Sequence, residues 1–432
     1  MDSRLRGNDS GCYPMAMKLR LLPPKTSLKG KRVLLRVDWN VPLTGSFAGE
    51  KALKLERTFG TIRNLADRGA VVVMMTHLGR PKGRDMKFST EKLAHIAHGM
   101  SDIPIHFCGE ALDTPAGLKK AQEMIHVAKP GTVFLLENVR FLKGEETDAP
   151  GIAKALASLG DIFVDDAFAA SHRAHASVVG VAKILPSFAG PSLAEEVAAL
   201  SRLLEKPKRP YIAVVGGAKL STKLGVLEAL LKVADRVLVG GAMAHPFFVA
   251  KGIKIGKSFT EKGGAAIAKK LMRNPKLALP TDAVVAPKLD PKKAHVVPIK
   301  EIKANEVIGD IGTETMMTWA AWLKKANTIA WNGPVGVAEI PTFSHGSLLL
   351  ARVIASRSKG SCFGVVGGGD TLPIVAKSGM GEWFDHVSTG GGAMLEFIAK
   401  KGSLPGLRVL QEKPTKTKKT KKTTTTTTKK RK

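Results

Sequence analysis

Cationic and imidazole side chains follow the apolar runs in the first half of this sequence. They are Arg57, His77, Arg80, Arg140, His172, Arg173 and His175, with Asp38 and Asn40 as nearby hydrogen-bond acceptors. Guanidinium groups bind phosphate and carboxylate through paired hydrogen bonds. The pattern therefore indicates a site for a small, highly anionic ligand whose hydroxyl groups Asp38 and Asn40 would bind. A metal site on His172 and His175 is not favoured, because no carboxylate or cysteine stands at matching spacing.

Glycine clusters take the corresponding places in the second half. They are Gly216-Gly217, Gly240-Gly241, Gly367–Gly369 and Gly390–Gly392. One cluster alone would mark a tight turn, but four are better explained by a nucleotide, because glycine lets backbone N–H groups approach phosphates at helix N-termini. Lys219 and Lys223 follow the first cluster. Asp370 follows the third, where a carboxylate would orient Mg²⁺ through water or phosphate.

Two familiar phosphate-binding patterns are absent from the sequence. The stretch from Gly252 to Ser258 is one residue short of a Walker A loop and follows a helical pattern, so we do not assign it that role. No G-x-G-x-x-G sequence follows a strand, which argues against a dinucleotide-dependent dehydrogenase.

The apolar runs alternate with helical patterns along the chain. Runs expected to be strands cover residues 32–37, 71–76, 133–136 and 162–164, then 211–215, 236–239, 283–286, 328–331, 362–366 and 386–388. Helical patterns cover residues 56–68, 89–100, 116–127, 151–159 and 193–204. This alternation predicts parallel sheets wound by right-handed crossovers. We expect an α/β protein of two doubly wound, Rossmann-like domains joined by a hinge helix, in which ligands bind at the carboxyl ends of the strands.

The net charge is strongly positive. Lys and Arg number 67 and Asp and Glu number 37, giving +30, of which residues 413–432 supply +10 and residues 18–412 supply +20. Such a surface attracts anionic small molecules, and nucleic-acid binding is an alternative. The low aromatic content of 5% and the lack of a recognition-helix or RNA-binding motif argue against nucleic acid as the main ligand.

The cellular setting follows from the cysteines and the apolar runs. The three cysteines lie far apart, and no apolar run approaches the ~20 residues that a membrane-spanning helix needs. We expect a cytoplasmic protein without disulfides.

The cationic residues of the first half and the glycine clusters of the second half together predict phosphoryl transfer between two closing domains. A basic two-lobed protein that binds small anions or nucleic acid without catalysis is the alternative, and Lys219 and Asp370 beside the glycine clusters favour the kinase.

Eight sequence motifs closely resemble those of the phosphoglycerate kinase family. They are Arg36–Pro42, Thr76–Gly83, Leu136–Phe141, Asp166–Phe168 with His172–His175, Gly216–Lys223, Trp331–Val337, Gly367–Thr371 and Ser388–Ala393. The resemblance covers roughly residues 18–411 in a single order. It implies a monomer that reversibly transfers the acyl phosphate of 1,3-bisphosphoglycerate to MgADP, giving 3-phosphoglycerate and ATP.

The resemblance also implies roles for individual residues. The substrate would be held by Asp38, Asn40, Arg57, His77, Arg80, Arg140, His172 and Arg173. Arg57, Lys219 and the glycines Gly390, Gly391 and Gly392 would act on the phosphoryl group in flight. The nucleotide would be held by Gly217, Lys219, Lys223, Gly240, Asn332, Pro334, Glu339, Gly368, Gly369, Asp370 and Thr371. Glu339 would lie at the ribose and Asp370 near Mg²⁺.

The same comparison implies a division of the chain. We expect an extension at residues 1–17, a 3-phosphoglycerate-binding domain at 18–190, a linker helix at 191–206 and a nucleotide-binding domain at 207–393. A segment at 394–411 would return toward the first domain, and a disordered Lys/Thr-rich tail would cover 412–432. The tail has nothing to bury and is expected to contact polyanions weakly. An alternative translation start lies at Met15 or Met17.

Several positions depart from the family pattern. Asp165 stands where the family usually has Asn, Thr313 where it has Pro, and Ala338 where it has Phe. Ala169–Ser171 differ from the usual Gly-Thr-Ala, and His245-Pro246 is unusual after Gly-Gly-Ala-Met-Ala. None removes a charged contact, but they bear on nucleotide affinity and base preference.

Overall fold

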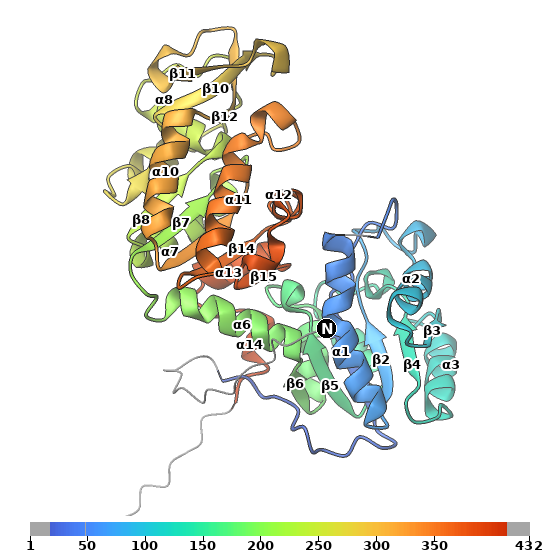
Figure 1. The fold of residues 1–432 in the computed structure, drawn as a ribbon. Coiled ribbons are helices and arrows are strands. Elements are labelled where there is room, and N and C mark those ends of the chain that lie inside the picture. The colour runs from blue at the N-terminus through green and yellow to red at the C-terminus, as the bar shows by residue number, and fades with distance from the viewer. Residues whose placement is uncertain (1–17, 48, 413–432) are drawn as a thin grey trace, which may run out of the picture.

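The computed structural model describes residues 18–47 and 49–412, which form two lobes joined by a helix (Figure 1). The predicted extension at residues 1–17 and the predicted tail from residue 413 lie outside the described residues. Glu412, assigned to the tail from the sequence, belongs to the described part, where its backbone N–H donates to Lys18 O at 2.9 Å. No helix in these described ranges is long and apolar enough to cross a membrane.

The first lobe is built on a six-stranded parallel sheet with the order β3-β4-β2-β1-β5-β6. The strands are β1 (Arg32–Val37), β2 (Val71–Met75), β3 (Ile105–Cys108), β4 (Val133–Leu136), β5 (Ile162–Asp166) and β6 (Ser187–Ala189). The central strands are apolar and buried on both faces, as a sheet covered by helices requires. Helices α1 (Glu50–Asp67) and α2 (Glu91–Ser101) pack on one face. Helices α3 (Pro115–His126), α4 (Pro150–Ala157) and α5 (Val181–Ile184) pack on the other.

The second lobe repeats this plan with the order β15-β14-β13-β7-β8-β9. Its strands are β7 (Tyr211–Val215), β8 (Arg236–Val239), β9 (Leu277–Ala278), β13 (Thr328–Asn332), β14 (Phe363–Gly367) and β15 (His386–Ser388). Helices α7 (Leu224–Val233), α8 (His245–Ala250), α9 (Gly264–Leu271) and α13 (Gly391–Ala399) cover one face. Helices α10 (Thr313–Lys325), α11 (His345–Ser358) and α12 (Leu372–Ser378) cover the other. The predicted α/β fold class is confirmed.

One expected strand belongs to a different sheet. The run at residues 283–286 is strand β10 (Asp282–Pro287), which pairs antiparallel with β11 (His295–Pro298) and β12 (Glu306–Ile311) in a separate three-stranded sheet. The prediction that this run belongs to the parallel sheet was wrong. A parallel neighbour needs a crossover of a dozen or more residues, and the connections that flank β11 are shorter than that.

Other differences concern short or edge elements. Strands β3, β6, β9, β11 and β12 were not predicted, and α1 begins at Glu50 rather than at residue 56. Strands β3, β6 and β9 lie at sheet edges or have two to four residues. Such strands are partly solvated and carry a weak apolar signal.

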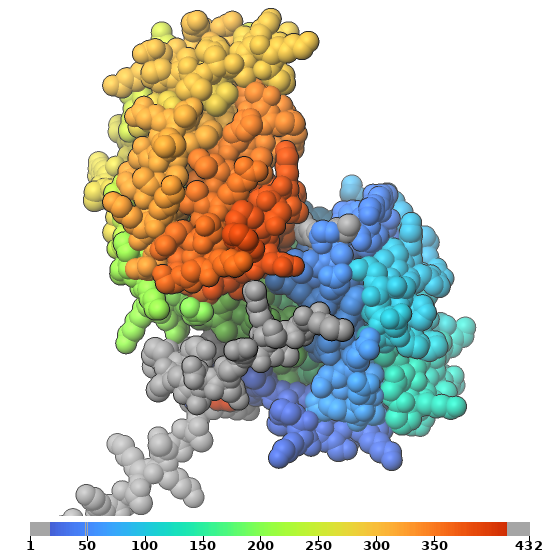
Figure 2. All heavy atoms as spheres, in the orientation of Figure 1, coloured from blue at the N-terminus to red at the C-terminus, as the bar shows by residue number. Residues whose placement is uncertain are grey.

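Helix α6 (Pro191–Leu204) connects the two lobes, close to the predicted hinge helix. Its buried residues Leu193, Val197, Leu200 and Leu203 belong to the same core cluster as residues of both lobes. The chain then returns to the first lobe through α14 (Pro405–Arg408), where Gly406 N donates to Ser171 O at 2.9 Å. Figure 2 shows the two lobes meeting at this end and separated by a notch above it.

Candidate active site

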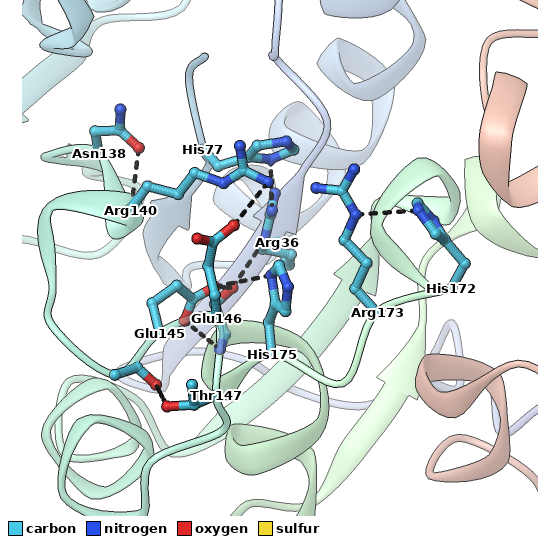
Figure 3. Close-up of polar contacts among 12 residues, drawn as sticks. Arg36, His77, Asn138, Arg140, Glu145, Glu146, Thr147, His172, Arg173 and His175 are labelled. Carbon is cyan, nitrogen blue, oxygen red and sulfur yellow. Dashed lines mark hydrogen bonds and ion pairs between the residues drawn. The ribbon is translucent and has the colours of Figure 1, made fainter. Parts of the chain in front are cut away.

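Six basic residues gather at the carboxyl ends of the first sheet, and we call them the basic cluster: Arg36, His77, Arg140, His172, Arg173 and His175 (Figure 3). Arg36 lies on β1, His77 follows β2, Arg140 lies in the turn after β4, and the other three follow β5. The sheet order β4-β2-β1-β5 makes these strands consecutive neighbours. Residues far apart in the sequence are thereby brought to one edge, as predicted for a parallel sheet.

The centre of the cluster is a buried contact between Arg36 and His77. Arg36 is 1% exposed, and its Nη2 lies 2.9 Å from His77 Nδ1 while its Nε donates to Ser177 Oγ at 3.2 Å. Burial lowers the pKa of Arg36. Burial, followed by the charges of Arg36, Arg140 and Arg173, holds the pKa of His77 well below its usual value. His77 is therefore neutral, and the positive charge of the cluster resides on its guanidinium groups.

Two glutamates that were not predicted balance part of this charge. Glu146 Oε1 pairs with Arg140 Nη2 at 3.3 Å. Glu145 is 1% exposed and accepts from Ser177 N at 2.9 Å and from Ser177 Oγ at 2.5 Å. Burial raises the pKa of Glu145 although Ser177 and Arg36 oppose it. Burial also lowers the pKa of the adjacent His175 to about 4, so this imidazole is neutral at neutral pH.

The outer residues of the cluster remain open to a ligand. Arg173 Nε donates to His172 Nε2 at 3.0 Å, and Arg173 has no ion pair among the described residues. Arg80 is exposed, and its charge contributes to lowering the pKa of Arg140, which places it near the cluster. Asn40 Oδ1 accepts from Gly79 N at 2.9 Å and so joins the ends of β1 and β2.

Arg57 and Asp38 line one small cavity between α1, α6 and the second lobe. Burial raises the pKa of Asp38, with Lys54 and Arg36 opposing. Arg57 Nη1 pairs with Glu196 Oε1 at 2.8 Å, and its Nη2 donates to Val387 O. In this structure Arg57 therefore contacts the hinge helix and the second lobe rather than the basic cluster.

In the second lobe, the predicted nucleotide residues Lys223, Asn332 and Thr371 form one hydrogen-bonded network with the glycine clusters, which we call the nucleotide network. Lys223 Nζ donates to Gly216 O at 2.6 Å and to Asn332 Oδ1 at 2.7 Å. Asn332 Nδ2 donates to Gly367 O at 2.9 Å, and Gly333 N donates to Thr371 Oγ1 at 2.8 Å. Burial lowers the pKa of Lys223 to about 8, with Asp370 opposing. The first and third glycine clusters are thus held together at the ends of β7, β13 and β14.

The glycines in this network are needed for close approach. A Cβ at Gly240 would lie 2.7 Å from the side chain of Val335, and one at Gly216 would overlap Pro334 O. Gly217 and Gly368 have φ values of +121° and +109°, which side chains rarely adopt. By contrast Lys219, Glu339, Gly369 and Asp370 lie at the more open rim. Lys219 lies close enough to Glu261 to contribute to lowering the pKa of that carboxyl.

The fourth glycine cluster lies where the two lobes meet. A Cβ on Gly391 would be 3.7 Å from Gly368 Cα in the second lobe, whereas one on Gly392 would be 3.9 Å from His172 Nε2 in the first lobe. Gly390 packs against the Phe168 ring. These glycines begin α13, whose first N–H groups have no partner within the helix and favour anions. The basic cluster and the nucleotide network are therefore joined by one helix N-terminus.

The phosphoglycerate kinase family model matches residues 24–401. The chain belongs to the phosphoglycerate kinase family. It is 44% identical over 390 residues to phosphoglycerate kinase from a strain of Thermus thermophilus, covering 89% of this chain and 97% of that protein. It is 41% identical over 391 residues to phosphoglycerate kinase from a Chelativorans species, covering 89% and 96%.

Solved phosphoglycerate kinases share the fold. The enzyme from Coxiella burnetii matches with a TM-score of 0.76 and 39% identity, covering 89% of this chain and 97% of that one. The enzyme from Pyrococcus horikoshii OT3 matches with a TM-score of 0.78 and 32% identity, covering 90% and 98%. The resemblance inferred from the motifs is confirmed. The chain is a kinase of glycolysis with a nucleotide substrate, and the alternative of a binding protein without catalysis is not favoured.

Among the described residues, no group of three or more His, Cys, Asp or Glu side chains is arranged to hold a metal ion. A Mg²⁺ ion that accompanies a nucleotide does not need such a group, because it is usually bound by one or two carboxylates together with substrate phosphates and water. Asp370, exposed beside the Gly368 loop, is a carboxylate of that kind.

Proposed function

We propose that this chain transfers the acyl phosphate of 1,3-bisphosphoglycerate to MgADP, and that the acceptor in the reverse direction is the carboxylate of 3-phosphoglycerate. The observation that carries the proposal is the position of Gly390–Gly392. Their helix N-terminus adjoins the Gly368 loop on one side and His172 of the basic cluster on the other. A phosphoryl group that passes between two ligands would meet these N–H groups on its path.

The basic cluster would bind the three-carbon substrate. Arg80, Arg140, Arg173, His77 and His172 would hold its phosphate and carboxylate, with Asp38 and Asn40 at its hydroxyl group. The neutral state of His77 and His175 suits hydrogen bonding, while the guanidinium groups supply charge. Glu145 and Glu146 leave this region cationic while limiting repulsion between the arginines in the free protein.

The nucleotide would lie across the carboxyl ends of the second sheet. Gly217, Gly240, Lys219, Lys223, Asn332, Pro334 and the Gly368–Thr371 loop would contact its phosphates and ribose, with Glu339 at the ribose. Lys223 is already ordered by Gly216 O and Asn332 Oδ1, and its third contact, to Asn332 O, is long at 3.4 Å. The N–H of this long contact would turn to a phosphate without the side chain first becoming ordered. Mg²⁺, held by Asp370 and the phosphates, would neutralise charge on the nucleotide.

The transfer step would depend mostly on position and charge. Lys219 and Arg57 lie on different lobes, so both reach one phosphoryl group only when the lobes close. Arg57 would then exchange Glu196 and Val387 O for phosphate oxygens. In the closed state water is excluded and each charge acts more strongly on the transition state.

The remaining assignments follow from the same proposal. Residues 18–190 would form the 3-phosphoglycerate-binding domain and residues 207–393 the nucleotide-binding domain, joined by 191–206 and completed by 394–411. The protein would act as a monomer in the cytoplasm. The Lys/Thr-rich tail would make weak, salt-sensitive contacts with polyanions.

A coupled assay tests the function directly. Purified protein with 3-phosphoglycerate and MgATP should form 1,3-bisphosphoglycerate and ADP, detected through NADH oxidation by an added dehydrogenase. Omission of 3-phosphoglycerate or Mg²⁺ should abolish the signal. No turnover by folded protein with both ligands present would contradict the proposal.

A further inference from the structure

His245 is a buried imidazole at the start of α8. It is one of the positions at which this sequence departs from the family pattern. It is 4% exposed and lies on the wall of a cavity of about 50 Å³ in the second lobe. The other walls are mainly apolar and include Gly241, Phe248, Ala283, Ile308, Val335 and Val337. The cavity adjoins the glycine clusters, because a Cβ on Gly241 would lie 2.9 Å from both Gly217 O and Pro334 O.

The hydrogen bonding of His245 determines its tautomer. His245 Nδ1 lies 2.7 Å from Phe259 O, and since a carbonyl oxygen only accepts, Nδ1 must carry the proton. Burial lowers the pKa of His245, and no charged side chain contributes to the shift. The imidazole is therefore neutral, with a lone pair on Nε2 that can accept a hydrogen bond.

This Nε2 acceptor is available to a ligand. Among the described residues it has no hydrogen-bond partner, yet it is not one of the polar atoms sealed from solvent. The ring is almost wholly buried and lines the adjoining cavity, and from this we infer that Nε2 opens into it. The two carboxylates beside the cavity are already engaged: Asp282 by Thr315 and Glu314 N, and Asp310 by Ile311 N and Gly346 N.

We propose that His245 determines base specificity, by accepting a hydrogen bond at Nε2 from the 6-amino group of an adenine whose amino edge enters this cavity. The inference rests on the proposed function, which brings a nucleotide to this lobe. A 6-oxo purine would place a carbonyl oxygen opposite the imidazole lone pair, leaving two acceptors without a proton between them. A site rejects a close analogue when binding that analogue would leave buried polar groups of the site without hydrogen-bond partners.

The test compares three nucleotides that differ at one position of the purine. For the unaltered protein with saturating 3-phosphoglycerate, kcat/KM should fall in the order MgATP, the Mg complex of purine riboside triphosphate (no 6-substituent), then MgITP. We expect at least about a tenfold preference for ATP over ITP. Equal kcat/KM for ATP and ITP would overturn the inference, and this comparison needs no variant to fold.

The variant His245→Phe then tests the residue itself. The ratio of kcat/KM for ATP to that for ITP should fall to within about threefold, through a higher KM for ATP, while KM for 3-phosphoglycerate is unchanged. His126→Phe, at the exposed end of α3 in the other lobe, is the matched control and should keep the unaltered ratio. A folded His245→Phe protein with that same ratio would contradict the inference. If none of the three nucleotides supports turnover, the result would instead contradict the proposed function.

Discussion

Arg57 on α1 and Glu196 on α6 form an ion pair of 2.8 Å across the base of the two lobes. Glu196 Oε2 also lies 2.9 Å from His386 Nε2 on β15, and Thr389 N donates to Glu196 Oε1 at 3.2 Å. Burial would raise the pKa of Glu196, but His386 and Arg57 outweigh it and hold this pKa below its usual value. If Arg57 moves to a phosphate as we propose, the Glu196 carboxylate keeps His386 and Thr389 N as partners and is not left unpaired.

Arg57→Ala and Lys219→Ala should each lower kcat by ~10²-fold or more with a smaller change in KM, because we propose that both contact the phosphoryl group mainly in the transition state. Steady-state kinetics with 3-phosphoglycerate and MgATP measure this. Unchanged kcat in either variant would remove that residue from the mechanism.

Two controls separate catalysis from structure in these variants. Lys251→Ala removes an exposed lysine of the same lobe as Lys219 and should leave kcat unchanged. Glu196→Gln weakens the ion pair while leaving Arg57 in place. If Arg57→Ala acted only by disturbing the hinge, Glu196→Gln would reduce kcat to the same extent.

Both ligands together should be needed for full closure of the lobes. The basic cluster and the nucleotide network lie on different lobes, so in-line transfer requires the lobes to approach. Small-angle X-ray scattering without ligands, with each ligand and with both should give the smallest radius of gyration only with both. An active preparation whose radius stays the same in the ternary complex would refute closure.

Asp165→Asn should stabilise the protein increasingly as pH rises. Asp165 is fully buried, and burial raises its pKa to about 7, with Ala167 N and Arg36 opposing and Asp166 adding to the rise. A folded pKa above the unfolded value means that stability is lost as pH rises from about 4 to 7. Asn carries no charge, so the gain in unfolding free energy should grow by about 3 kcal/mol between pH 5 and pH 8.

Urea unfolding of both proteins across this pH range measures the effect. A residual pH dependence will remain, because burial also raises the pKa of Asp310 to about 7. Asp67→Asn, at an exposed site on α1, is the control and should show no such growth. A difference between Asp165→Asn and the unaltered protein that is constant with pH would show that Asp165 does not titrate in this window.

Removal of the tail after Glu412 should leave the melting temperature and kcat unchanged and reduce retention on heparin or RNA at low salt. Residues 413–432 hold ten cationic side chains and no acid, and such contacts weaken steeply with salt. The end point is Glu412 rather than Gln411 because Glu412 N donates to Lys18 O. Unchanged retention would assign polyanion binding to the lobes, and unfolding would make the tail part of the fold.

The sequence was most informative about those site residues whose position depends on the parallel strand that they follow. His77, Arg140 and Arg173 each follow a strand, and parallel strands necessarily bring their carboxyl ends to one edge. Arg36 and Glu145 were missed as site residues, because one lies inside an apolar strand and the other in a loop with many charges. A charged residue within a buried strand is the signal that would have identified Arg36.

Contacts between the lobes could not be predicted in the same way. The contacts of Glu196 with Arg57 and His386 depend on how α1, α6 and β15 pack against one another. The local periodicity of the sequence carries no information about that packing. The antiparallel sheet of β10, β11 and β12 was missed for a related reason. Strand runs of both kinds have similar composition, and only the length of their connections separates them.

The return of α14 to the first lobe makes that lobe discontinuous in the chain. Leu19 pairs with Gln411, so residues from the two ends of the described chain lie side by side. Gly406 N also donates to Ser171 O in the first lobe. During synthesis the first lobe emerges early but lacks this segment until the second lobe has been made. The second lobe is thus an insertion within the first, and residues 405–411 reach the first lobe only after the second lobe has been made. Because domains generally fold as units in the order in which they are made, the second lobe can fold before the first lobe has all of its contacts.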